Sequence, residues 1–150
     1  MALADLCVVN LEVSTAEDAI RHLARKLAER GFVLPSFETA ALKREKRSPT
    51  GLPFPGAGIA LPHAEPEHVA QAGIAIATLL RPVYFRQMGS PTIKLEVSLV
   101  VMPVLTAKEQ ALAGLSRLIE LLQDDGVRAG LLGAKTSSEL AELLGLPLGA

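Results

Sequence analysis

The sequence predicts an α/β domain in which helices are layered on a mixed β-sheet of about five strands. Two patterns of helical periodicity, over residues 16–30 and 108–123, flank a central block of short apolar segments that are typical of strands. Glycine- and proline-rich stretches separate those segments. With 150 residues the chain can bury a core without metals or disulfides, so we expect one domain over residues 1–150.

Composition limits both the core and the class of protein. Hydrophobic residues make up 49% of the chain and aromatic residues only 3%, so the core has to consist mainly of Leu, Val, Ile and Ala. The net charge of −1 comes from 15 basic and 16 acidic residues spread along the chain, which argues against nucleic-acid binding. The single cysteine, Cys7, excludes an internal disulfide and a thiolate cluster, and we expect a buried structural thiol.

No apolar run approaches the roughly 20 residues that a membrane-spanning helix needs. The N-terminus also lacks the basic and apolar regions of a signal peptide. These two observations predict a cytoplasmic protein that does not insert into a membrane.

The first 31 residues predict one strand and one helix. Residues 1–13 are apolar and partly β-branched, as in an edge strand. Ser14 and Glu17 form the pattern of a capping box, and apolar residues then recur at helical spacing. Gly31 is expected to end this helix.

The next segment predicts a second helix and a long loop. Ser36 is expected to cap a helix that ends at the basic residues 43–47. Residues 48–58 contain several prolines and glycines, so we expect a loop with fixed turns. This loop leads into a short apolar run, residues 58–61, which predicts a buried strand.

The remaining strands and helices follow from the same two periodicities. We expect strands at 73–80, 83–85 and 95–102, with turns at 81–82 and 88–91, and helices at 108–123, up to residue 132, and at 137–144.

The histidine after the strand at 58–61 is the main candidate for a functional residue. A proline ends the strand, and His63, one of three histidines, follows at once, so its imidazole is expected at the sheet edge, facing solvent. An imidazole there can act as a general acid or base, bind a metal, or attack as a nucleophile. A histidine that only hydrogen-bonds its neighbours is the alternative.

Several of these chemistries have little support. His63 and His68 are five residues apart, a spacing that suits metal ligands on neither a strand nor a helix, and Glu65 and Glu67 fit a solvated loop. The chain has no Gly-x-Ser-x-Gly nucleophile elbow and no phosphate-binding P-loop. We therefore expect no metal and no serine-hydrolase triad.

The segment Gly-Ile-Ala-Leu-Pro-His-Ala, residues 58–64, resembles the phosphorylation motif of the fructose/mannitol-type IIA domains of the bacterial phosphoenolpyruvate:sugar phosphotransferase system. Residues 43–51 are similar to the Arg-Glu and Pro-Thr segment that lies upstream of this motif in the family. The strand at 95–102, the helix after it and the C-terminal segment at 137–140 are in family order. The resemblance thus covers nearly the whole chain and implies the fructose/mannitol-type IIA fold.

The resemblance implies a phosphotransferase component that needs no cofactor. His63 would accept a phosphoryl group from the phosphohistidine of HPr and pass it to a cysteine of a IIB component, which works with a membrane-embedded IIC component. Residues 83–87 look most like the galactitol-type branch, so a sugar or sugar alcohol is the expected cargo. The alternative is a regulatory IIA-like protein whose phosphorylation at His63 controls a partner without sugar transport.

The resemblance also implies supporting residues around His63. Arg44 would bind the phosphoryl group through its guanidinium, although it could instead be part of a solvated helix end. Glu45 and Thr50 are possible supports, and Thr50 could equally shape the turn in which it lies. Mannitol-type members carry a second histidine where this chain has Gln110, which can hydrogen-bond a phosphate or orient His63 but cannot carry a proton.

Overall fold

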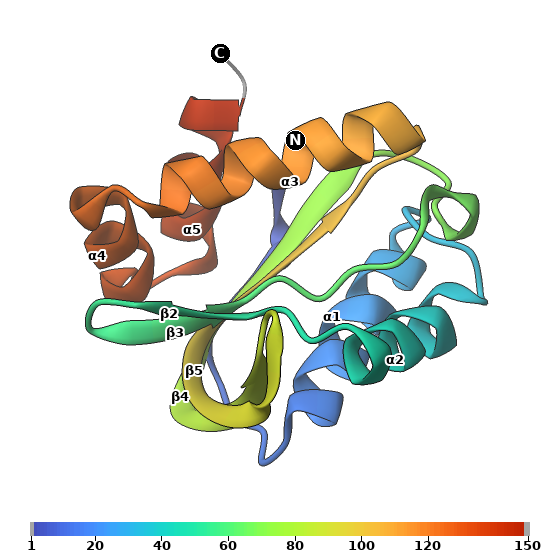
Figure 1. Cartoon of the computed structure of the whole chain (residues 1–150). Coiled ribbons are helices and arrows are strands. Elements are labelled where there is room, and N and C mark those ends of the chain that lie inside the picture. The colour runs from blue at the N-terminus through green and yellow to red at the C-terminus, as the bar shows by residue number, and fades with distance from the viewer. Residues whose placement is uncertain (1, 149–150) are drawn as a thin grey trace.

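One mixed β-sheet lies between two layers of helices (Figure 1). The structure is a computed structural model that describes the backbone of residues 2–148 and, within that range, the side chains of all residues except 2–3, 109, 111 and 145–148. Its elements, in chain order, are β1 (Ala2–Leu11), α1 (Ala16–Glu29), α2 (Phe37–Arg47), β2 (Gly51–Phe54), β3 (Ala57–Ala60), the 3₁₀ helix η1 (Pro66–His68), β4 (Gly73–Gln87), β5 (Ser90–Val104), α3 (Lys108–Leu122), α4 (Asp125–Gly133) and α5 (Ser137–Leu148).

The sheet combines parallel and antiparallel pairs. β4 pairs with β1 in parallel and with β5 in antiparallel orientation. β5 pairs in parallel with β3, which forms an antiparallel hairpin with β2. The tip of the long β4–β5 hairpin curls back to β2, where Gly51 is the partner of Gln87 and the Met88 N–H donates to the Gly51 carbonyl at 2.8 Å. The predicted mixed sheet of about five strands is confirmed.

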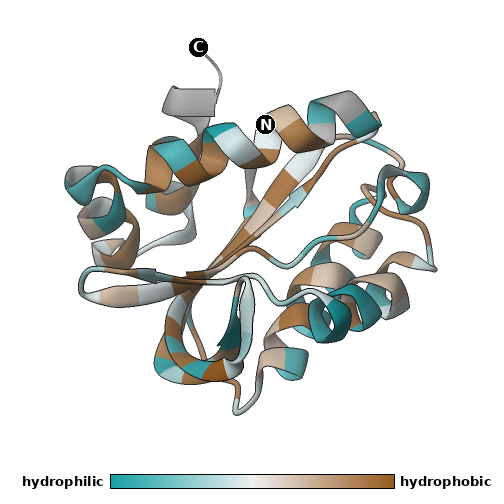
Figure 2. Ribbon diagram, viewed as in Figure 1, coloured by the Kyte–Doolittle hydropathy of each residue, from teal (hydrophilic) through white to brown (hydrophobic). Residues whose placement is uncertain are grey.

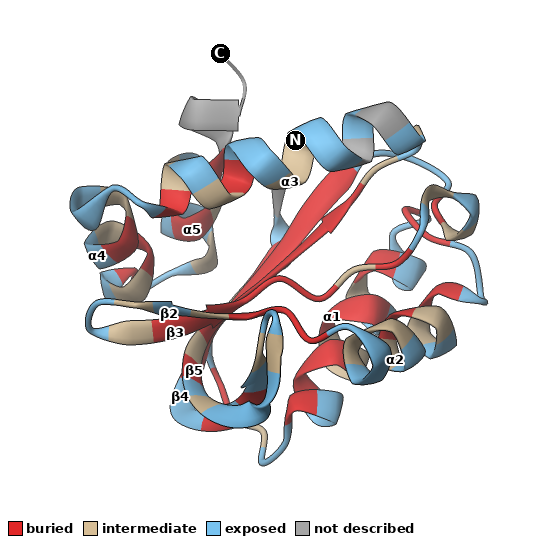
Figure 3. Cartoon of the chain, in the orientation of Figure 1, coloured by how far each residue is buried: buried red, intermediate tan, exposed pale blue. Residues whose placement is uncertain are grey.

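Alternation along the strands builds a separate core on each face of the sheet. In β4, Ala75 and Ala77 pack with α1 and α2, whereas Ile74 and Ile76 pack with the helices at the C-terminal end. Cys7 of β1 lies in this second core, as predicted, and its burial, reinforced by the charge of Asp5, raises the pKa of its thiol to about 11. Figures 2 and 3 show the apolar, buried strands between the two helical layers.

Two of the predicted helix caps are wrong in detail. Thr15, and not Ser14, is the N-cap of α1, because its side chain accepts the Asp18 N–H at 3.1 Å. Ser36 occupies the position before α2 but caps nothing, since its hydroxyl lies 2.8 Å from Nδ1 of His68. Gly31 follows α1 with a φ of 77°, a left-handed conformation that suits glycine and ends the helix as expected.

The predicted loop at 48–58 is also wrong, because most of it forms the β2–β3 hairpin. Gly56 makes the turn with a φ of 84°. The prolines do not prevent this pairing because β2 has only the single parallel partner residue Gln87 on its other side.

The two strands predicted at 73–80 and 83–85 form one continuous strand, β4. Its pairing with β5 is irregular between Thr78 and Val83, where Pro82 has no N–H to donate to the ladder. The sequence signal at Arg81-Pro82 therefore marks an irregularity within a strand and not a turn. The strand predicted at 95–102 and the three C-terminal helices are confirmed within a few residues, although β5 begins earlier, at Ser90.

Candidate functional site

His63 lies three residues beyond the carboxyl end of β3. Leu61 and Pro62 are buried, and His63, whose imidazole was expected to face solvent, is half-buried. Its Nδ1 is 2.7 Å from the carbonyl oxygen of Leu61. A carbonyl can only accept, so Nδ1 carries the hydrogen, and in the neutral ring Nε2 keeps a free lone pair. The main chain thus selects the tautomer of this imidazole.

Burial is the main cause that lowers the pKa of His63 below its ordinary value of 6.5. The hydrogen bond to Leu61 raises this pKa, the positive charge of Arg44 lowers it, and the carboxylate of Glu65 raises it. The net direction favours the neutral ring near pH 7. A neutral imidazole with a free Nε2 is a competent nucleophile and hydrogen-bond acceptor.

A buried threonine connects β3 to α2 directly upstream of His63. Thr50 is 1% exposed, and its hydroxyl donates to Oε1 of Glu45 at 2.7 Å while accepting the N–H of Leu61 at 3.1 Å. The Thr50 N–H donates to the other carboxylate oxygen, Oε2, at 2.9 Å. Leu61, whose N–H Thr50 holds, also supplies the carbonyl acceptor for His63. The hydrogen bonds therefore run from Glu45 through Thr50 and Leu61 to the imidazole.

Glu45 anchors this chain of hydrogen bonds from the last turns of α2. Burial is the main cause that raises the pKa of Glu45 above 4.5, and Glu17 acts in the same direction. The two bonds from Thr50 and the charge of Arg44 act the other way. Glu45 and Thr50 were possible supports in the sequence, and the structure brings both into contact with the segment that carries His63.

Arg44 is close enough to His63 for its charge to affect the imidazole, but its described hydrogen bond goes elsewhere. Its Nη1 donates to the Ser48 carbonyl at 3.2 Å, at the end of α2. Arg44 also lines a cavity of about 320 Å³ together with Thr50. Next to it, Arg47 forms an ion pair of 3.5 Å with Glu65 and so ties α2 to the segment after His63. A guanidinium that gives up its bond to Ser48 is free to bind a phosphoryl group.

Gln110 and His68 are less closely tied to His63. Gln110 is exposed in the first turn of α3 and lines a different cavity, beside Gly73 and Pro103. No hydrogen bond between described residues links Gln110 to His63. His68 lies in η1 against Ser36, and the described part of the chain has no group of three His, Cys, Asp or Glu side chains arranged to hold a metal ion.

The sequence did not point to Leu61, which contributes to the site only through its main chain. A main-chain carbonyl leaves no residue-type signal. The one available hint is Pro62, whose fixed φ and missing N–H restrict the path from Leu61 to His63. This restriction helps to place the ring against a carbonyl two residues earlier.

The fold and the site together define an α/β domain that presents one neutral histidine beyond the end of a sheet strand. The chain belongs to the family described as "Phosphoenolpyruvate-dependent sugar phosphotransferase system, EIIA 2", whose model matches residues 3–145. IIA domains of this system are phosphotransferase components that carry a phosphoryl group. The family expected from residues 43–51 and 58–64 is therefore confirmed.

Similar proteins include both transport and regulatory components. The chain is 31% identical over 142 residues to the PTS system 2-O-alpha-mannosyl-D-glycerate-specific EIIABC component of Escherichia coli, an alignment that covers 93% of this chain but 21% of that protein. The chain thus spans about a fifth of the length of this relative.

Solved structures confirm the expected fructose/mannitol-type IIA fold. The mannitol IIA domain of Escherichia coli, in its complex with phosphorylated IIB, aligns with a TM-score of 0.77 and 24% identity over 97% of this chain and 99% of that one. The nitrogen regulatory protein IIA-Ntr of Neisseria meningitidis aligns with a TM-score of 0.73 and 25% identity over 95% of each chain. Among the described residues, no helix is long and apolar enough to cross a bilayer.

Proposed function

We propose that the chain acts as a single cytoplasmic IIA domain over residues 1–150, in which His63 carries the phosphoryl group. The observation that carries this proposal is the hydrogen bond from Nδ1 of His63 to the Leu61 carbonyl, which leaves Nε2 as the nucleophile. His63 accepts the group from the phosphohistidine of HPr and passes it to a cysteine of a IIB component. An associated IIC component moves the sugar.

The first transfer is a displacement at phosphorus. The Nε2 lone pair of His63 forms the new N–P bond, the N–P bond of the HPr phosphohistidine breaks, and its electron pair returns to the HPr imidazole. Such a transfer requires positioning and charge stabilisation more than covalent help from the protein. The half-buried ring, with its lowered pKa, provides the unprotonated nitrogen without a separate base.

The second transfer moves the group to the IIB component. The cysteine thiolate attacks phosphorus, an S–P bond forms, the N–P bond on His63 breaks, and the ring returns to its neutral state. The mannitol IIA domain that shares this fold was solved in a complex with phosphorylated IIB, which supports a IIB component as the partner here.

Arg44, Glu45 and Thr50 have separate parts in this proposal. Arg44 stabilises the negative charge on the phosphoryl oxygens after its guanidinium leaves Ser48. Glu45 and Thr50 keep the Leu61 peptide in place and so hold the ring of His63. Gln110 is exposed, and its proposed role is limited to a hydrogen bond to the phosphoryl group when a partner is docked.

The sequence and the similar proteins bear on the cargo and on the transport role. Residues 83–87 and Gln110 favour a galactitol-like sugar alcohol as cargo, whereas the relatives reported above are a mannosylglycerate component and a mannitol domain. A regulatory role without transport is the second candidate, and the similar fold of a nitrogen regulatory IIA protein supports it.

One assay tests the carrier function. The protein is incubated with phosphoenolpyruvate, enzyme I and HPr, and its intact mass is followed before and after addition of a cognate IIB component. The proposal predicts an acid-labile gain of one phosphoryl group that disappears when IIB is added. A gain that persists in His63→Ala would contradict the proposed site, and a gain that IIB never removes would favour the regulatory role.

A further inference from the structure

A broad cleft separates the α1–α2 layer from the β4–β5 hairpin, on the part of the molecule where Figure 1 shows the hairpin curling below β2 and β3. Its volume is about 890 Å³. We propose that this cleft binds a small organic anion with two phosphoryl groups, of the hexose bisphosphate class. His63 does not line this cleft, which shares only Glu45 with the hydrogen bonds that lead to His63, and the proposal does not depend on the proposed phosphocarrier function.

Basic side chains come to the cleft from both of its walls. Five cationic residues line it, contributed by α1, α2, β4 and β5: Arg21, Lys43, Lys46, Arg86 and Lys94. The whole chain has a net charge of −1, so this concentration of positive charge is local and not a consequence of composition. Clefts lined by one sign of charge attract ligands of the opposite sign.

The hairpin wall places two like charges directly opposite each other. Arg86 of β4 and Lys94 of β5 are cross-strand partners, and both are exposed. Like charges in this relationship destabilise a sheet. Neither side chain has an ion pair with another described residue, and Lys94 instead lies 5.6 Å from the centre of the Tyr84 ring. A bound anion would relieve this repulsion.

The helical wall of the cleft, like the hairpin wall, has cations without ion pairs among the described residues. Lys43 and Lys46 are three residues apart, on one face of α2, and neither forms an ion pair with a described residue. Two carboxylates also line the cleft, but Glu45 is already bound to Thr50 and its pKa is raised by burial. Glu17 is the second. Arg21 is already paired with Asp18 at 3.2 Å, so Glu17 faces the four remaining cations, and one glutamate cannot balance them.

The size and lining of the cleft favour a small molecule. Its volume is within the range of about 300–1,000 Å³ that is typical of small-ligand sites. The lining also contains apolar side chains, among them Ile20, Leu42 and Phe85. Cations from both the helices and the hairpin suit a ligand with two phosphoryl groups, and the apolar side chains suit its carbon skeleton.

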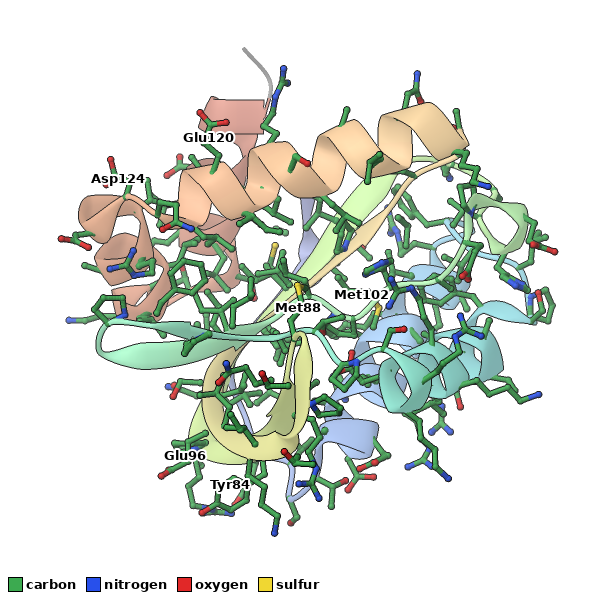
Figure 4. All side chains as sticks on the ribbon, viewed as in Figure 1. Tyr84, Met88, Glu96, Met102, Glu120 and Asp124 are labelled. Carbon is green, nitrogen blue, oxygen red and sulfur yellow. The ribbon has the colours of Figure 1, made fainter. Side chains whose placement is uncertain are left out.

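Tyr84 provides a natural probe of this cleft. It is the only tyrosine in a chain without tryptophan, and it lines the cleft while 60% exposed. Figure 4 shows Tyr84 on the curled part of the hairpin, away from Glu120 and Asp124 on the other helical layer. Its fluorescence therefore reports on the cleft and on little else.

The test is a titration with fructose 1,6-bisphosphate, followed by tyrosine fluorescence and by the melting temperature. We expect a saturable fluorescence change and a rise in melting temperature, because a ligand that binds only the folded state stabilises it. Arg86→Gln and Lys46→Gln should each weaken binding roughly tenfold, which is the effect of one lost charge-assisted hydrogen bond. Without ligand, Arg86→Gln should melt at a higher temperature than the wild type, because the repulsion from Lys94 is removed.

Matched controls separate this site from general salt effects. Arg117→Gln and Lys135→Gln remove exposed charges on α3 and before α5 and should bind as the wild type does. Fructose, and sodium sulfate at equal ionic strength, should give no saturable change. A bisphosphate effect that is absent, that sulfate reproduces, or that both sets of variants share would overturn the proposal. So would tighter binding of a polyglutamate peptide, which would indicate an acidic protein partner.

Discussion

The imidazole of His63 hydrogen-bonds the main-chain carbonyl of Leu61, two residues earlier, with 2.7 Å between Nδ1 and the oxygen. Pro62 lies between them and restricts the chain to an extended path. Leu61 also donates its main-chain N–H to the hydroxyl of Thr50. A buried hydroxyl thus holds the residue whose carbonyl orients the ring that we propose as the phosphoryl acceptor.

The lowered pKa of His63 predicts a pH dependence of stability. Between its folded pKa and the ordinary value of 6.5, the folded protein binds fewer protons at His63 than the unfolded chain does, so stability falls as the pH is lowered through this window. Chemical denaturation gives the free energy of unfolding of wild type and of His63→Gln at each pH. The difference, wild type minus variant, should decrease as the pH is lowered from 7.5 to 5.

The comparison of wild type with His63→Gln also controls for the titration of other groups. His22 also has a pKa lowered by burial, and its contribution is present in both proteins and cancels. A wild-type advantage that is independent of pH, or that grows as the pH falls, would show that His63 is not held neutral by its surroundings.

Removal of the Thr50 hydroxyl should cost both stability and transfer. Thr50→Val keeps the shape of this 1% exposed side chain but leaves the Leu61 N–H without an acceptor and Oε1 of Glu45 without its hydroxyl donor, while the main-chain bond from Thr50 to Oε2 remains. We expect a loss of about 1–3 kcal/mol in the free energy of unfolding and slower phosphorylation of His63. Thr50→Ser keeps the hydroxyl and should recover most of the transfer rate. Equal rates for Thr50→Val and wild type would remove Thr50 from the site.

Arg44 should affect the rate of transfer and not the fold. Its described hydrogen bond is to the exposed Ser48 carbonyl at 3.2 Å, so Arg44→Ala should unfold like the wild type. Stopped-flow transfer from phosphorylated HPr should be slower by about tenfold or more, as expected for one lost hydrogen bond to a charged group. Arg47→Ala, which loses only the ion pair to Glu65, is the control. An unchanged rate for Arg44→Ala would contradict its proposed role.

Gly58 should tolerate no side chain. A Cβ at this position would lie 2.3 Å from the main-chain oxygen of Glu96, so the paired strands β3 and β5 would have to separate. We expect Gly58→Ala to lower the free energy of unfolding by about 2 kcal/mol or more, measured by chemical denaturation. Gly133→Ala is the matched control, because no atom lies within 4 Å of its added Cβ. Similar effects for the two variants would contradict the close approach at Gly58.

Periodicity predicted most of the fold, because the buried faces of α1, β4 and β5 all have strong apolar patterns. The strand predicted at 58–61 corresponds to β3, but β2 and its hairpin with β3 were missed because local signals for turns, glycine and proline, outweigh a strand of four residues. Gly51 and Gly58 bring this hairpin close to the main chains of Arg86 in β4 and Glu96 in β5, contacts that only the assembled sheet shows.

For the candidate site, the residues could be predicted from the sequence but their contacts could not. His63 could be found from its position after a strand-ending proline, and Glu45 and Thr50 from the family motif. Their hydrogen bonds could not be predicted, since Thr50 meets the Leu61 N–H across 11 residues of chain. The basic cleft was also not predictable, because its cations come from four separate elements that only the fold brings together.

The most direct test of the proposed site is the identity of the phosphorylated ring nitrogen. Long-range ¹H–¹⁵N NMR of the ¹⁵N-labelled protein distinguishes Nδ1 from Nε2 before and after phosphorylation by phosphoenolpyruvate, enzyme I and HPr. We predict a neutral His63 with its proton on Nδ1 beforehand and phosphorus on Nε2 afterwards. Phosphorylation at Nδ1, or an unphosphorylated His63, would contradict the proposed role of the Leu61 carbonyl.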